Sequence, residues 1–153
     1  DAYALAILEA ILSHGKSSRL YRSLVYEQKT ALAVGAEYEV LQTDPQLFFA
    51  FVVVKPGQKI EEAEQALYKE FERIQNIPPT EHELQRAKNQ VEADHLFGQD
   101  STFRQAMLLG QAETVGAGWR FIDKFLDRIR GVTAQDVQRV ARQYLNADTR
   151  TVG

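Results

Sequence analysis

The chain lacks cysteine and contains one methionine, one tryptophan and three histidines among its 153 residues. The absence of cysteine excludes a disulfide-stabilised scaffold, a thiol nucleophile, a thiolate zinc site and an iron–sulfur cluster. With 18 basic against 21 acidic residues the net charge is −3, so we expect no nucleic-acid partner. No apolar run approaches the roughly 18 residues that a membrane helix requires. Composition therefore indicates a globular domain, and function has to come from motifs.

The length predicts one domain, residues 1–153, whose core is large enough to fold without a metal or a disulfide. Asp1 begins the chain without a methionine or a basic leader, so a mature segment or a fragment of a longer chain is expected. The lack of cysteine fits a periplasmic and a cytoplasmic protein alike. The compartment therefore stays open, with membrane association through segments outside this chain as a further alternative.

Apolar residues recur at helical spacing along most of the chain. The helices expected from this spacing cover 3–13, 17–28, 60–75, 80 to a break near 98, 101–114, 119–130 and 133–144. Thr80 with Glu83, and Thr133 with Asp136, form capping boxes in which each side chain bonds the other residue's free backbone N–H. These pairs predict where two of the helices begin.

Two central stretches have strand character. Residues 31–40 alternate, with Leu32, Val34 and Ala36 on the expected apolar face. Residues 47–54 read LFFAFVVV, a run typical of strands that are covered on both faces. Left exposed, such a strand is an aggregation hazard, and we expect the isolated chain to self-associate or to bind a hydrophobic dye.

The order of elements predicts an α+β fold in which helices cover an antiparallel sheet. A turn is expected at 43–45, and 149–153 are expected to begin a last strand. Two or three strands are few for a core of this size, so a first strand is expected before Asp1.

The histidines give no complete metal site. Neither HExxH nor HxxEH occurs, and His82 and His95 are placed on different faces of one helix. Glu92 and His95 have half of the spacing found in di-iron bundles, but the second half is absent. A serine triad is an open alternative, because triads assemble in space even though no G-x-S-x-G occurs.

Residues 15–24 read GKSSRLYRSL and stand between an apolar helix and a strand of small residues. This stretch resembles the C-terminal, non-zinc domain of the pitrilysin, insulinase and mitochondrial-processing-peptidase family of inverzincin metallopeptidases. The helix start at Thr80 and the stretches 119–123 and 129–145 are similar to the same domain, in the same order. The residues that carry the family motif are Gly15, Ser17, Ser18, Arg19 and Leu20.

The resemblance implies a zinc metalloendopeptidase whose paired homologous domains close around a chamber for peptide substrates. Zinc would sit outside this chain, in an N-terminal domain with an HxxEH helix, and this chain would hold none. Many members supply a substrate-binding Arg and Tyr from the C-terminal domain, and those positions are Val25 and Leu32 here. Neither side chain can donate a hydrogen bond, and Tyr26 is one position out of register.

The missing Arg/Tyr pair suggests two origins for the chain. In two-subunit bacterial members the zinc-bearing chain lacks the pair and a homologous partner subunit supplies it, so this chain would come from the zinc-bearing subunit of a heterodimer. The alternative is a scaffold homologue of the same fold with no peptidase activity, such as the core subunits of respiratory complexes. An HxxEH motif before Asp1 distinguishes the two.

Overall fold

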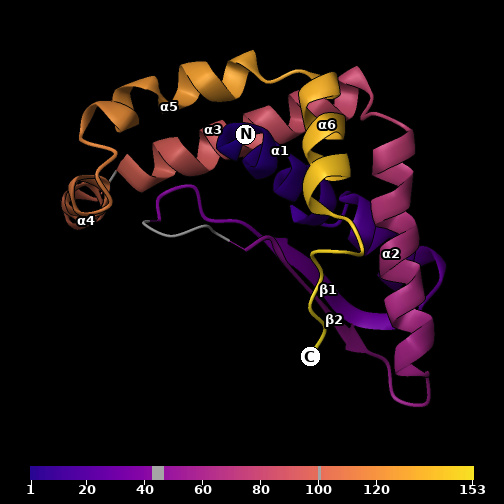
Figure 1. The fold of residues 1–153 in the computed structure, drawn as a ribbon. Helices are drawn as coiled ribbons and strands as arrows, with labels where there is room; N and C mark the ends of the chain where they lie inside the picture. Colours follow the sequence, from indigo (N-terminus) through magenta and orange to yellow (C-terminus); the bar gives the residue numbers. More distant parts are fainter. Residues whose placement is uncertain (43–46, 100) are drawn as a thin grey trace.

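The computed structural model describes residues 1–42, 47–99 and 101–153. Its elements are α1 (Ala2–Ser13), the π-helix η1 (Tyr21–Glu27), β1 (Ala31–Glu37), β2 (Phe49–Val54), α2 (Ile60–Asn76), α3 (Glu81–Gln99), α4 (Thr102–Thr114), α5 (Arg120–Gly131) and α6 (Ala134–Tyr144). The predicted α+β class is confirmed, because helices pack against one face of an antiparallel β1–β2 sheet (Figure 1). None of the helices in the described ranges is long and apolar enough to cross a membrane.

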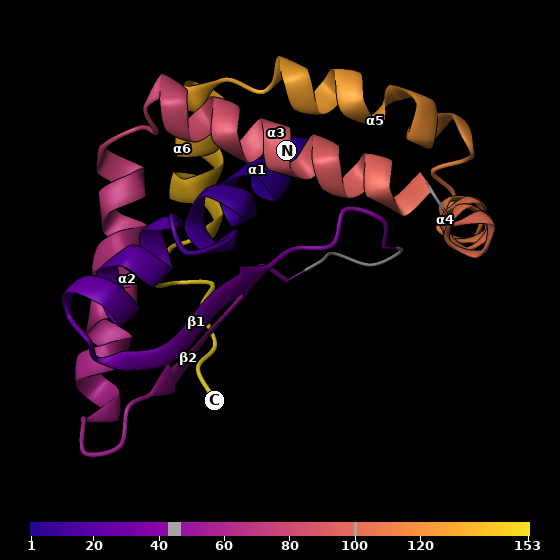
Figure 2. The same cartoon turned by 180° about the vertical axis from the view of Figure 1, so that it is seen from behind.

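Helix α1 is the centre of the core. Its side chains Ile7, Leu8, Ile11 and Leu12 are almost completely buried. The helix contacts β1 on one side and α3, α5 and α6 on the others, and both views show it between those helices and the sheet (Figure 2). A helix that is apolar all round must be enclosed in this way.

The sheet covers α1 with one face only. Inward-facing Ala50 and Val52 pack against the core, whereas Phe49, Phe51 and Val53 are exposed. Among the described residues nothing covers the outer face of 49–54, so the predicted cover on that face would have to come from outside this chain. The placement of Leu32 on the apolar face is wrong: a register shift between Ala31 and Ala33 leaves its side chain 57% exposed.

Both predicted capping boxes are confirmed. The Thr80 hydroxyl accepts a bond from the Glu83 N–H while Glu83 accepts one from the Thr80 N–H, and Thr133 and Asp136 repeat the arrangement at α6. The helix predicted over 17–28 is a π-helix from Tyr21 onward, where the Gln28 N–H bonds the Ser23 carbonyl. This five-residue pattern has no simple signature in the sequence.

Three further expectations concern helix and strand ends. The break expected near 98 is confirmed, because α3 ends at Gln99 and α4 begins at Thr102. Residues 149–153 are not a strand, and the Thr149 N–H instead bonds the Asn146 side chain. The turn predicted at 43–45 lies outside the described residues.

Candidate functional site

The 15–20 motif joins α1 to η1 and turns the chain sharply. Gly15 has a φ of +73°, a conformation that other residues rarely adopt, and the Ser18 N–H bonds the Gly15 carbonyl. Ser18 and Leu20 are completely buried behind this turn. The turn thus places Arg19 on the inner side of the junction, where it faces the start of α3.

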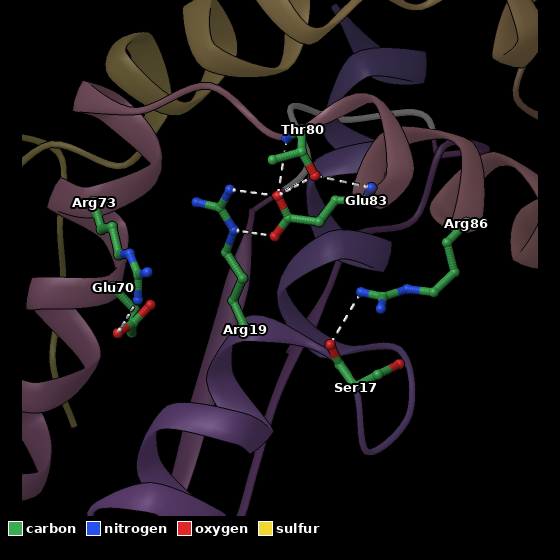
Figure 3. Close-up of polar contacts among 7 residues, drawn as sticks. All are labelled: Ser17, Arg19, Glu70, Arg73, Thr80, Glu83 and Arg86. Carbon is green, nitrogen blue, oxygen red and sulfur yellow. Dashed lines mark hydrogen bonds and ion pairs between the residues drawn. The ribbon is translucent and has the colours of Figure 1, made fainter.

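Arg19 makes a two-pronged ion pair with Glu83. Its Nε and Nη2 atoms donate to the two carboxylate oxygens at 2.8 and 3.0 Å, and the two side chains are only 11% and 22% exposed (Figure 3). Burial by itself raises the pKa of Glu83. The hydrogen bonds from Arg19 and Thr80, with the Arg19 charge, outweigh it and lower the pKa from 4.5 to about 2.

A second contact fixes the same junction. Nη2 of Arg86 donates to the Ser17 carbonyl at 3.0 Å (Figure 3). All five motif residues therefore stabilise the junction of α1 and η1. Gly15 permits the turn, Ser18 and Leu20 are buried behind it, and Ser17 and Arg19 bind α3. In the described structure these residues hold the start of α3 against the α1–η1 turn, and none of them forms a nucleophile or metal centre.

Val25 and Leu32, the positions where the family resemblance implies an Arg and a Tyr, lie in one hollow. The hollow has a cavity volume of about 290 Å³ and is also lined by Tyr26, Lys29 and Lys55. Tyr26 and both lysines are exposed. The hollow thus has hydrogen-bond donors on its rim, although Val25 and Leu32 supply none.

A cluster of Glu9, His14 and Asp94 borders a second cavity of about 410 Å³. Nε2 of His14 lies 3.0 Å from Oδ2 of Asp94, and Nδ1 lies 3.8 Å from Oε1 of Glu9. Burial, followed by the charges of Asp94 and Glu37, raises the pKa of Glu9 from 4.5 to about 7. The sequence analysis missed this cluster, because residues 9 and 94 are brought together only by the packing of α1 on α3.

Glu92 and His95, which have half of the di-iron spacing, do not form a joint site. Glu92 forms an ion pair with Arg130, whereas the His95 ring stacks on Phe125 at a centroid distance of 5.1 Å. His82 is exposed at the start of α3. Among the described residues, no group of three or more histidine, aspartate or glutamate side chains could hold a metal ion.

Comparisons with known proteins agree with the motif. The family model of the "Peptidase M16 inactive domain" matches residues 1–91. An uncharacterized zinc protease of Streptomyces coelicolor is 27% identical over 143 residues. The match covers 94% of this chain and 31% of the Streptomyces protein, so the chain spans less than a third of that relative.

Solved structures share the fold. The inactive peptidase domain of a proposed zinc protease from Bordetella parapertussis superposes with a TM-score of 0.87 at 29% identity, over 97% of this chain and 78% of that one. A protease from Helicobacter pylori gives a TM-score of 0.85 at 24% identity, over 95% of this chain and 35% of that one. Because the family model covers more than half of the chain, the chain belongs to the peptidase M16 inactive-domain family.

Proposed function

We propose that this chain is the C-terminal, non-catalytic domain of a zinc metalloendopeptidase that degrades peptides or unfolded chains. The observation that carries the proposal is the match to the M16 inactive domain together with a zinc-protease relative of which the chain spans 31%. The described residues do not fit a zinc ion, because they offer no group of three ligands. Zinc would therefore be held by another domain of a longer protein, where it would supply the activation of a water molecule.

This domain would then form part of the wall of the substrate chamber. Its partners would be a zinc-bearing N-terminal domain of the same chain, a homologous partner subunit and the peptide between them. Two features support this role: the sheet leaves its outer face open, and the Val25/Leu32 hollow opens beside the same sheet. Since neither Val25 nor Leu32 donates a hydrogen bond, the partner subunit would supply the groups that polarise the peptide backbone.

The test starts with the residues encoded before Asp1. An HxxEH motif there, with EDTA-sensitive cleavage of an unfolded casein substrate by the complete protein and its partner subunit, is the expected result. Absence of the motif would instead favour the scaffold alternative. Residues 1–153 alone should not cleave the casein substrate. EDTA-sensitive cleavage by this chain would overturn the proposal that catalysis resides in another domain.

A further inference from the structure

Helix α4 lies at one end of the molecule, away from α2 and from the β1–β2 sheet (Figure 1 and Figure 2). Its inner side packs against the rest of the chain through Ala112, which is completely buried, and Leu108, which is half-buried. The side-chain Nε2 of Gln111 also donates a hydrogen bond of 2.8 Å to the Leu41 carbonyl. These contacts fix the orientation of α4 and turn its other side outward.

The outward side of α4 carries large apolar side chains. Phe103 is 73% exposed and Met107 is 60% exposed, and a spacing of four residues places both on one side of the helix. They border a hollow of about 460 Å³ whose lining residues carry no charge and include Ala106, Gly110 and Thr114. We call Phe103, Ala106, Met107, Gly110 and Thr114 the α4 face.

The α4 face has both a projection and a recess. Phe103 and Met107 project from it, whereas Ala106 and Gly110 have a methyl group and a hydrogen atom. A Cβ atom added at Gly110 would meet no other heavy atom within 4 Å, so the space above this residue is open in the described structure. A surface with a knob next to a hole can pack against itself when it is turned by a two-fold rotation.

We propose that two copies of this chain associate through the α4 face. The two α4 helices would run antiparallel about a two-fold axis that passes between Met107 and Gly110, so that Met107 of each copy enters the recess above Gly110 of the other. This contact joins identical chains, and it goes beyond the proposed function because it requires neither zinc nor a homologous partner subunit.

The absence of charge on the α4 face favours a second copy as its occupant. In a two-fold contact every residue near the axis lies close to the same residue of the other copy. A charged residue there would meet its own charge in a desolvated place, which is unfavourable. The described lining of the hollow contains no such residue.

The exposed apolar area is also close to what a dimer requires. Phe97, at the end of α3, is 70% exposed and Trp119, just before α5, is 50% exposed, and both α3 and α5 contact α4. With these two side chains, the apolar area exposed at this end of the molecule is roughly 650 Å². A stable protein interface buries about 800 Å² on each partner, so we expect a dimer with a dissociation constant in the micromolar range.

The first test is sedimentation velocity of residues 1–153 between roughly 1 and 100 μM. The unchanged chain should pass from monomer to dimer over this range. Met107→Glu should weaken the dimer at least about tenfold, because each new carboxylate would be buried against the other copy. The helix itself should persist, since glutamate is a good helix former and Met107 is exposed.

Phe49→Glu is the matched control. Phe49 is 55% exposed on the outer face of the sheet, and its replacement should leave the α4 dimer unchanged. A chain that stays monomeric throughout would overturn the proposal. A dimer that is lost in Phe49→Glu and kept in Met107→Glu would also overturn it, because the interface would then be the sheet.

Cysteine crosslinking tests the antiparallel geometry, since the chain contains no cysteine of its own. Gly110→Cys places the two thiols about 4 Å apart along the helix axis, at a rise of 1.5 Å per residue, within the range of a disulfide. Phe103→Cys places them about 16 Å apart, which is too far. Mild oxidation should therefore link Gly110→Cys into a covalent dimer and leave Phe103→Cys as a monomer. Equal crosslinking of the two variants, or none in Gly110→Cys, would contradict the geometry.

The dimer and the proposed peptidase role are tested separately. The Gly110→Cys crosslink is also expected in the complete protein, and its absence there would assign the α4 face to another domain. EDTA-sensitive cleavage by the complete protein together with a monomeric 1–153 chain would refute the dimer alone. A crosslinked dimer together with a missing upstream HxxEH would refute the peptidase assignment alone.

Discussion

Replacing Glu83 by glutamine tests whether the Arg19–Glu83 pair is a principal support of the fold. The substitution keeps the shape of the side chain and removes its charge. Arg19 would then keep a mostly buried guanidinium without a counter-charge, and its Nη1 atom already lacks a hydrogen-bond partner within the described residues. A buried charge left in this state is strongly destabilising.

The magnitude follows from the pKa of Glu83. A fall from 4.5 to about 2, at 1.36 kcal/mol per pH unit, corresponds to about 3 kcal/mol of unfolding free energy. Because the pKa is lower in the folded chain, this contribution is fully present above pH 4.5 and is lost as the pH falls towards 2. Glu83→Gln should therefore be about 3 kcal/mol less stable at pH 7, and the difference should shrink below pH 4.5.

The assay is urea unfolding followed by circular dichroism, at pH 7 and at steps between pH 5 and pH 2. Glu81→Gln is the matched control, since Glu81 lies in the same first turn of α3 and is exposed. We expect it to change stability by less than about 0.5 kcal/mol. Equal stabilities of the two variants at pH 7, or an undiminished difference at pH 2, would refute the reasoning.

Three other outcomes follow from the described structure. Glu9→Gln should stabilise the chain by up to about 3 kcal/mol at pH 8 and by nothing below pH 4.5, because the raised pKa of Glu9 removes stability as the pH rises from 4.5 to 7; equal urea midpoints at pH 8 would contradict this. Ile11→Ala should cost about 2–5 kcal/mol, whereas Ile60→Ala, at an exposed position, should cost less than about 0.5 kcal/mol in the same titration. Anilinonaphthalene sulfonate should fluoresce with the chain and lose much of that signal in Phe51→Ser; an unchanged signal would place the dye elsewhere.

Sequence patterns predicted the structure correctly where the interacting residues are close together in the chain. Thr80 and Glu83 are three residues apart and so are Thr133 and Asp136, and both pairs form the predicted caps. The Gly15–Leu20 motif was likewise recognisable from its order alone, and it led to the correct family. In each of these cases the residues that decide the structure are neighbours in the chain.

The failures concern partners that are distant in the sequence. Leu32 is exposed because β1 shifts register against β2, and strand alternation within 31–40 contains no trace of that shift. Arg19 and Glu83 are 64 residues apart, so neither motif indicates the other. The open face of β2 could not be foreseen from LFFAFVVV either, since a run of apolar residues shows that a strand is apolar on both faces but not what covers each face.

The central proposal is that this chain is part of a zinc peptidase whose zinc ion is bound outside residues 1–153. The most direct measurement is the zinc content of purified residues 1–153 and of the complete protein, determined by inductively coupled plasma mass spectrometry after dialysis against zinc. The account predicts one zinc ion per complete chain and none per 1–153 chain. One zinc ion bound by 1–153, or none by the complete protein, would contradict it.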